Sequence, residues 1–380
     1  MATSLRQRLL LLSGGLLASG LLGWTALALA ESLLGIRDPE FRYENKLDMW
    51  RLDRDVGFVN APSFEAYAWG TVAIRTDARG FRTRRGGPLP TSGPRIVGIG
   101  DSVMWGTGVD AADSLLGQLE ARLRRDGPVH AINAGVVGYS SLQSLRFLEK
   151  FVLPLEPDVV LLNFCNNDLL PTEDPFGNVR AIHAEYLREL LARVGEGLDA
   201  AERRSAQQTI ALLNSNSPVW PQIEAFEMPR STRDAMVRLL VERPIVRMVS
   251  LVRATGGRML VLIIPPRSGG SNFARSARSL SRSVRKAGGE VVDLTAHLAL
   301  EPRRRSEAEP VWFPLLPALE RILRWRGIQV AHTGRDFLDF VHPSRRGNAV
   351  VADRIAEHLR AASWWTPGCD RPEGCSPAAL

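Results

Sequence analysis

The twelve residues 95–106 constrain the fold of this chain more than any other stretch. They begin as a short apolar run with β-branched residues, which is typical of a buried strand. The run breaks at Gly100 and continues into Asp101 and Ser102, and leucines at helical spacing follow further on. A strand that leads through a polar turn into a helix indicates an open α/β sheet, which places its ligands at the carboxyl ends of its strands. Ser102 is therefore a candidate functional residue.

The alternation of strands and helices continues along the chain. Further strands are predicted at 129–133, 158–164, 258–264 and 290–294, with a basic helix at about 272–287 and a last helix at about 344–361. The segment 158–164 is almost entirely apolar, as a parallel strand covered on both faces requires. We therefore expect an α/β/α domain with helices on both faces of a parallel sheet.

Two segments, about 169–235 and about 296–335, interrupt this alternation. Both leave the predicted sheet near its carboxyl edge, and the first is mostly helical in pattern. Loops at that edge shape substrate sites. We expect these insertions to act as lids or as walls of the site.

Composition limits the classes of partner. The 380 residues carry a formal net charge of +7, and nearly all basic residues are arginines. No basic stripe is interleaved with aromatic residues, so we expect no nucleic-acid partner. A general arginine bias and an attraction to anionic lipid or polysaccharide both remain open.

None of the three cysteines has zinc-site spacing with histidine, and no metal or cofactor is expected. Cys369 and Cys375, in the tail 364–380, are close enough in sequence to pair in an oxidising compartment.

Residues 1–31 have the pattern of a membrane segment. Arg6 and Arg8 precede the uncharged run 9–30, which as a helix would be about 33 Å long, enough to cross a bilayer core of about 30 Å. The arginines predict that the rest of the chain is exported. A signal peptide cleaved near Ala30 is the alternative. Both interpretations place the main domain outside the cytoplasm, on the periplasmic or extracellular side.

Three further polar blocks follow the Ser102 turn in order. They are residues 133–138, which end at Gly138, residues 166–168, and residues 339–343. The tripeptide Gly-Asp-Ser alone is common in turns, but four ordered blocks are far more specific. Over residues 93–363 the chain resembles the SGNH (GDSL-type) hydrolases, whose blocks supply serine, glycine, asparagine and histidine. The resemblance implies a three-layer, flavodoxin-like α/β/α fold, preceded here by an extension at 32–92 that we expect to pack on the core.

The resemblance also implies roles for five residues. Ser102 is the nucleophile, His342 is its base, and Asp339, three residues earlier, orients the imidazole. The backbone N–H groups of Ser102 and Gly138 and the side-chain amide of Asn167 form the oxyanion hole.

Several neighbours are rivals for these roles. His332 is a rival base and Asp336 a rival acid, while Asn163 and Asn166 lie close to Asn167 in sequence. Asp101 is interpreted as structural, bracing the nucleophile turn. Cys165 stands where the family usually has glycine, which puts the shape of the pocket in question.

These residues predict a serine esterase that cleaves acyl esters, with short acyl groups favoured. The substrate is a small-molecule, glycan or lipid ester. One alternative is an O-acyltransferase that acetylates an exported or cell-surface polysaccharide. A second is an inactive carbohydrate-binding or assembly protein on the same fold.

Overall fold

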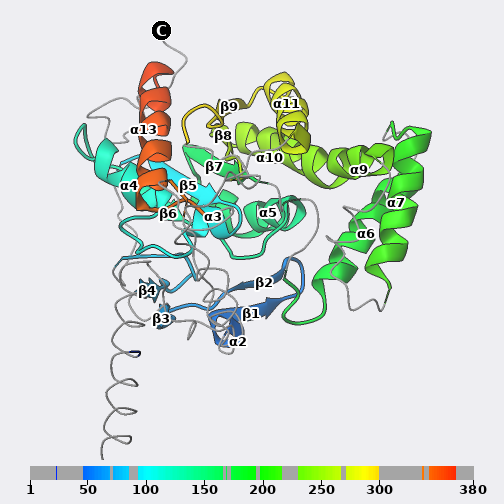
Figure 1. The fold of residues 1–380 in the computed structure, drawn as a ribbon, viewed down its shortest axis with the longest axis horizontal. Coiled ribbons are helices and arrows are strands. Elements are labelled where there is room, and N and C mark those ends of the chain that lie inside the picture. Colours follow the sequence, from blue (N-terminus) through cyan, green and yellow to red (C-terminus); the bar gives the residue numbers. More distant parts are fainter. Residues whose placement is uncertain are drawn as a thin grey trace, which may run out of the picture.

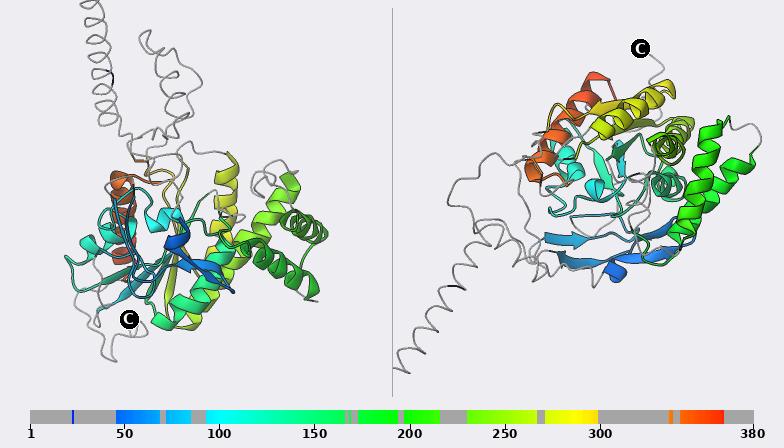
Figure 2. Two further views of the ribbon diagram at one scale, coloured as in Figure 1. Left: turned by 90° about the horizontal axis from the view of Figure 1, so that it is seen from below. Right: turned by 45° about the vertical axis from the view of Figure 1, so that its right-hand side comes forward.

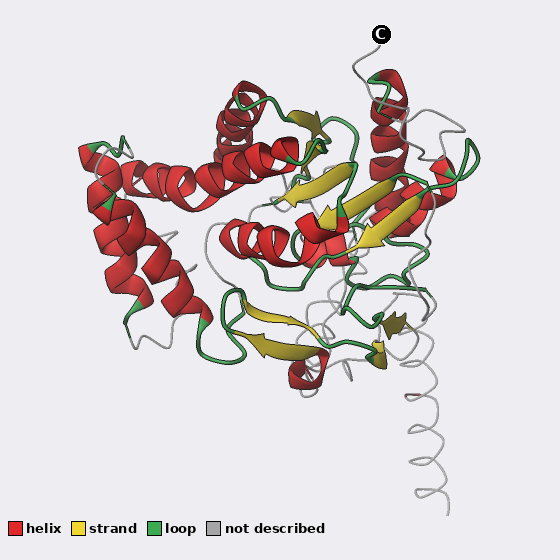
Figure 3. Ribbon diagram, turned by 180° about the vertical axis from the view of Figure 1, so that it is seen from behind, coloured by secondary structure: helices red, strands yellow, loops and turns green. Residues whose placement is uncertain are grey.

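A computed structural model describes most of the chain. The described residues are 23, 46–68, 72–84, 93–165, 168, 173–193, 197–215, 230–266, 271–298, 336–337 and 342–364. At its centre lies a five-stranded sheet in which every pair of neighbouring strands is parallel (Figures 1 and 3). In spatial order its strands are β6 (His130–Asn133), β5 (Arg95–Ile99), β7 (Val159–Phe164), β8 (Arg258–Ile263) and β9 (Glu290–Asp293).

Helices cover both faces of this sheet, which confirms the predicted α/β/α class. One face carries α5 (Ser141–Phe147), α10 (Arg243–Ala254) and α11 (Ser271–Lys286); the other carries α4 (Leu115–Leu123) and α13 (Arg345–Ala361). Successive strand residues point to opposite faces. In β5, Val97 and Ile99 join the core under α5 and α10, whereas Ile96 joins the core under α4 and α13. The central strands β5, β7 and β8 are therefore covered on both faces.

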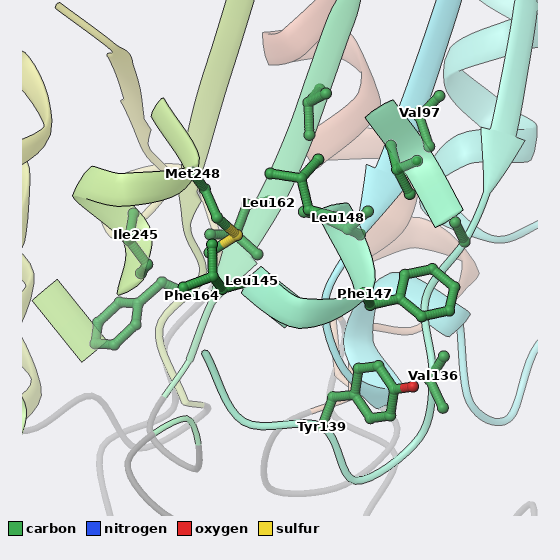
Figure 4. Packing of buried hydrophobic residues seen from close by; sticks show 14 of the residues in the cluster. Val97, Val136, Tyr139, Leu145, Phe147, Leu148, Leu162, Phe164, Ile245 and Met248 are labelled. Atoms are coloured by element: carbon green, nitrogen blue, oxygen red, sulfur yellow. The ribbon is translucent and has the colours of Figure 1, made fainter. Parts of the chain in front are cut away.

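The core on the α5 and α10 face is densely packed (Figure 4). Leu145 of α5 and Ile245 and Met248 of α10 lie beside Leu162 and Phe164 of β7 in the same buried cluster. Each large apolar side chain buried in this way contributes about 1.5–3 kcal/mol. After α5 the chain continues through a π-helical turn η2 (Leu148–Val152) and a 3₁₀ turn η3 (Leu153–Leu155) into β7. This packing fixes the strand ends from which the site is built.

An N-terminal layer precedes the sheet and packs against one side of it (Figure 2). It consists of a short helix α2 (Lys46–Met49) and two antiparallel hairpins, β1 (Trp50–Asp53) with β2 (Gly57–Asn60) and β3 (Glu65–Ala68) with β4 (Val72–Arg75). The hydroxyl of Tyr139 donates a hydrogen bond to the carbonyl of Phe58, and the side-chain amide of Asn60 donates one to the carbonyl of Gly135 at 3.0 Å. The extension thus contacts the loop between β6 and α5.

The first insertion forms a helical subdomain to one side of the sheet (Figure 1). It contains α6 (Val179–Ala192), α7 (Ala200–Leu213) and α9 (Arg230–Val237), and the π-helical segment η4 (Arg238–Glu242) joins α9 to α10. These helices share an apolar cluster of their own that includes Leu187 and Leu240. The mostly helical pattern predicted for this insertion is thus found in its described part. The second insertion lies outside the described residues from 299 to 335.

The predicted membrane segment receives no support from the structure. Apart from Gly23, residues 1–31 lie outside the described part of the chain. Among the described residues, no helix is long and apolar enough to cross a membrane. The N-terminal span therefore stays a prediction. The pairing of Cys369 with Cys375 also stays a prediction, because both cysteines lie outside the described residues.

Candidate active site

Ser102 is the first residue of a four-residue helix, α3 (Ser102–Trp105), which follows the carboxyl end of β5. The turn between them depends on Gly100, whose φ of +136° is rarely adopted by other residues and where a Cβ atom would collide with the side-chain oxygen of Asn163. Asp101 caps the helix because its carboxylate accepts a hydrogen bond from the N–H of Val103 at 2.9 Å. The serine is thereby fixed at the edge of the sheet where ligands bind.

His342 contacts this serine although 240 residues separate them. Its Nε2 atom lies 2.8 Å from the hydroxyl oxygen of Ser102, within hydrogen-bonding distance. His342 is half-buried and comes two residues before Ser344, which caps α13 by accepting a hydrogen bond from the N–H of Gly347 at 3.2 Å. A neutral imidazole in this position accepts the serine proton, so the pair can work as nucleophile and general base.

The remaining predicted site residues are only partly covered by the structure. Gly138 lies in the loop between β6 and α5 with a φ of +86°, and that loop is tied to the nucleophile turn by a hydrogen bond from the N–H of Val136 to the carbonyl of Gly100 at 3.0 Å. As the first residue of a helix, Ser102 has an N–H group with no acceptor inside that helix. Asn167 and Asp339 lie outside the described residues.

Two of the rivals have other contacts. The carboxylate of Asp336 lies 3.3 Å from the guanidinium of Arg346. The side-chain amide of Asn163 donates to the carboxylate of Asp101 at 2.8 Å and so braces the nucleophile turn. His332 and Asn166 lie outside the described residues.

Cys165 contacts the cap of the nucleophile helix. Its thiol is buried and lies 3.0 Å from the second carboxylate oxygen of Asp101, to which it donates, while its N–H donates to Asp168 at 2.6 Å. Burial, and secondarily the nearby charge of Asp101, hold the pKa of Asp168 well above its usual range. The three contacts to Asp101, from Val103, Asn163 and Cys165, confirm that this aspartate is structural.

Arg82 is a supporting residue that the sequence analysis did not single out. Its guanidinium is buried and donates to the carbonyls of Trp105 and Gly106, at 2.5 and 2.6 Å, and to that of Val109. It therefore satisfies carbonyl groups at the C-terminal end of α3, where a cation also complements the helix dipole. Desolvation lowers the pKa of this arginine to about 10, so it remains charged at neutral pH. The signal in the sequence was an arginine directly after the turn residues Gly80 and Phe81.

A second serine–histidine pair lies in the interior. Ser140, the N-cap of α5, has its hydroxyl oxygen 2.7 Å from Nε2 of His183 on α6. The other ring nitrogen, Nδ1, lies 2.9 Å from the carbonyl of Val179 and must carry the proton, since a carbonyl only accepts. Complete burial lowers the pKa of His183 to about 4. This pair connects the helical insertion to the residue two positions after Gly138.

Comparison with known proteins identifies the class of protein to which this fold and site belong. The model of the GDSL-like Lipase/Acylhydrolase family matches residues 99–350, which include Ser102, Gly138 and His342. The chain belongs to this family of SGNH/GDSL hydrolases, and it is a serine hydrolase that acts on ester bonds.

Some solved structures are similar to this chain, at low sequence identity and low TM-score. A catalytic mutant of Axe2, an acetylxylan esterase from Geobacillus stearothermophilus, is 11% identical with a TM-score of 0.40, covering 73% of this chain and 99% of that one. LAE5, an alpha/beta hydrolase enzyme from the metagenome of Lake Arreo, Spain, is 15% identical with a TM-score of 0.37, covering 73% of this chain and 98% of that one. No curated protein sequence matches this chain significantly.

Proposed function

We propose that the protein hydrolyses short-chain acyl esters through an acyl-enzyme intermediate on Ser102. The observation that carries this proposal is the 2.8 Å contact between Nε2 of His342 and the hydroxyl oxygen of Ser102. A serine hydroxyl is a weak nucleophile until a base within hydrogen-bonding reach removes its proton. The family of esterases to which the chain belongs supports the same chemistry.

The reaction then proceeds in two balanced steps. In the first, the Ser102 oxygen attacks the ester carbonyl while His342 takes the serine proton, and the imidazolium returns that proton to the leaving alcohol. In the second, His342 takes a proton from water, the hydroxide displaces the Ser102 oxygen from the acyl group, and the proton returns to the serine. Asp339 would accept the Nδ1–H of His342 and stabilise the imidazolium.

The developing oxyanion needs hydrogen-bond donors. We assign this role to the N–H groups of Ser102 and Gly138 and to the amide of Asn167. Removal of one such donor costs about 2.7–4 kcal/mol of transition-state stabilisation in well-studied hydrolases. The left-handed backbone at Gly138 supports its part in this proposal, because a side chain there would be strained.

A fluorophosphonate probe tests the proposal. We expect a single serine adduct at position 102 in the unaltered chain, no adduct in Ser102→Ala, and strongly reduced labelling in His342→Ala. Hydrolysis of p-nitrophenyl acetate should likewise be abolished in Ser102→Ala and strongly reduced in His342→Ala. Labelling that persists in Ser102→Ala would rule out this serine as the nucleophile.

The fate of the acyl group separates hydrolysis from transfer. If a sugar hydroxyl replaced water in the second step, the same residues would make the protein an O-acyltransferase. Incubation with p-nitrophenyl acetate and an oligosaccharide, followed by mass spectrometry, distinguishes free acetate from acetylated sugar.

We also propose that residues 9–30 hold the hydrolase domain at a membrane with the site on the outer side. The uncharged run behind Arg6 and Arg8 supports this proposal. A tagged chain should remain with the membrane fraction in carbonate washes and be accessible to protease from outside. Recovery of a soluble form that begins just after Ala30 would favour a cleaved signal peptide.

A further inference from the structure

The positive charge of this chain is concentrated in one stretch. Residues 243–289 contain nine arginines, one lysine and no aspartate or glutamate, which gives this stretch a net charge of +10. The whole chain carries only +7, so the remainder sums to −3. A general preference for arginine would raise the charge throughout the chain and does not account for this local excess.

Two long helices on opposite faces of the sheet show how differently the arginines are used. All four arginines of α13 form ion pairs, Arg345 with Asp113 at 3.1 Å, Arg346 with Asp336, Arg354 with Glu357, and Arg360 with Asp126. The basic residues of α11 make no ion pair with any described residue. Within the part of the chain that the structure describes, the arginines of α13 are therefore paired with acids and the basic residues of α11 are not.

The basic residues of α11 form one continuous strip. They recur at three- and four-residue spacing, opposite the buried side of the helix that carries Phe273 and Leu280. With a neighbour from α10 they make up what we call the arginine face: Arg247, Arg275, Arg278, Arg282, Arg285 and Lys286. All are exposed except Arg275, which is half-buried. From Arg275 to Lys286 the strip is about 16 Å long at a rise of about 1.5 Å per residue.

One end of the arginine face lies at the edge of the sheet that carries the site. The ring of Phe273, near the start of α11, stacks on the ring of Phe164 with centroids 5.5 Å apart and planes 10° apart. Phe164 is the last residue of β7, the neighbour of the strand that leads to Ser102. An elongated molecule bound along α11 can therefore reach the carboxyl edge of the sheet.

Carboxylates lie in a cleft beside the arginine face. Arg247 and Ser283 border a cleft of about 720 Å³ that is also lined by Glu202 and Glu242. Glu202 pairs with Arg238 at 2.9 Å, and Glu242 accepts a hydrogen bond from the hydroxyl of Ser283 at 3.0 Å. Neither of these two carboxylates forms an ion pair with Arg247 or with a basic residue of α11.

We propose that the arginine face binds an anionic polysaccharide and presents it to Ser102, so that the acyl esters cleaved are those on an acidic glycan. This inference rests on the proposed esterase function and names its substrate class. Each exposed charge interacts weakly, but several along one strip act together on a polyanion. Arginine forks also match carboxylate and sulfate groups.

A lipid surface fits this face less well. Helices that bind membranes bury apolar side chains in the interface. The apolar residues of α11 are turned into the core, and the only large hydrophobic side chains exposed among the described residues, Leu52 and Phe176, belong to neither α10 nor α11. A glycan needs no such insertion.

The test compares two triple variants that lose the same charge. Arg278→Gln, Arg282→Gln and Arg285→Gln remove the centre of the arginine face. Arg125→Gln, Arg203→Gln and Arg204→Gln remove exposed arginines from α7 and from the residues that follow α4. Each triple is made in the full chain with Ser102→Ala, and its fold is checked by circular dichroism and thermal unfolding.

Binding is measured by affinity electrophoresis in gels that contain polygalacturonate. At about 50 mM salt we expect the α11 triple to bind at least about tenfold more weakly than its parent and the control triple less than twofold more weakly. Neutral acetylated xylan should bind no differently to any of the three. Equal weakening of both triples, or a loss that appears only with phosphatidylglycerol vesicles, would overturn the proposal.

The outcome is separable from that of the proposed function. Hydrolysis of p-nitrophenyl acetate by the unaltered chain tests the esterase alone. Turnover of that ester without retention by polygalacturonate defeats this inference and leaves the esterase standing. Retention without turnover leaves the binding of polygalacturonate by the arginine face standing and defeats the esterase, and with it the assigned substrate class.

Discussion

Two serine–histidine pairs among the described residues have nearly the same nitrogen–oxygen distance and different chemistry. Nε2 of His342 lies 2.8 Å from Ser102, and Nε2 of His183 lies 2.7 Å from Ser140. His183 is completely buried, its Nδ1–H is held by a main-chain carbonyl, and its pKa is lowered to about 4. Burial therefore disfavours the protonated form of this histidine. His342 is half-buried at the carboxyl edge of the sheet, where a substrate can approach.

A short serine–histidine distance therefore does not by itself define a nucleophile. Burial of the imidazole disfavours its charged form, which the first step of acyl transfer requires. What distinguishes Ser102 is its position directly after a central strand, at the start of a helix capped by Asp101. The pair at Ser140 instead joins the helical insertion to the first turn of α5.

The largest expected difference between the pairs is in activity. His342→Gln should lower kcat/KM for p-nitrophenyl acetate by about 10⁴-fold or more, because it removes the base. His183→Gln should lower it by less than about tenfold in the protein that remains folded. A loss of similar size in a folded His183→Gln variant would break the comparison.

Arg82 contacts the end of the helix that begins at Ser102 and does not contact the Ser140–His183 pair. Its substitution therefore tests the first pair alone. Arg82→Met should lower the free energy of unfolding by about 3–5 kcal/mol, because three buried carbonyl groups lose their donor. It should also slow labelling of Ser102 by a fluorophosphonate, because these carbonyls belong to the end of α3 and the loop beyond it. Arg79→Met, at an exposed position in the same turn, is the matched control and should change stability by less than about 0.5 kcal/mol. Urea titrations and labelling rates measure both effects.

The burial of His183 predicts that the stability of the protein depends on pH. The pKa of His183 is about 4 in the folded protein and about 6.5 in an unfolded chain, so the unfolded state binds more protons between these values. Stability due to this group is fully present above pH 6.5 and falls by about 3 kcal/mol as the pH drops to 4. Urea unfolding of His183→Gln across this range should lack that part of the decline. Parallel curves for the variant and the parent would contradict the buried, neutral state of this histidine.

The smallest effect is expected at Cys165. Cys165→Ala removes the thiol that donates to Asp101 and should cost about 1–2 kcal/mol of unfolding free energy. Cys165→Ser keeps a donor and should recover part of the unfolding free energy lost in Cys165→Ala. If the alanine variant were as active and stable as the parent, the thiol would have no part in holding the nucleophile turn.

Much of the fold was predictable because its elements carry local patterns. The strands at 95–99 and 158–164 are apolar along almost their whole length, and the helix at 345–361 follows a serine cap. The two N-terminal hairpins were not predicted as hairpins. Strand length does not explain this, because β6 and β9 also have four residues and were predicted. The predicted roles of Asn167 and Asp339 remain predictions.

The sequence by itself determined that a parallel α/β sheet forms and that Ser102 follows one of its strands, because both depend on neighbouring residues. The family resemblance predicted that His342 meets Ser102, and the structure places the two within 2.8 Å. The strand order β6-β5-β7-β8-β9 and the burial of Arg82 and His183 came from the tertiary structure alone. Each of these depends on which distant segments pack together, and no local pattern records that choice. The same packing made one histidine a candidate base and the other part of the core.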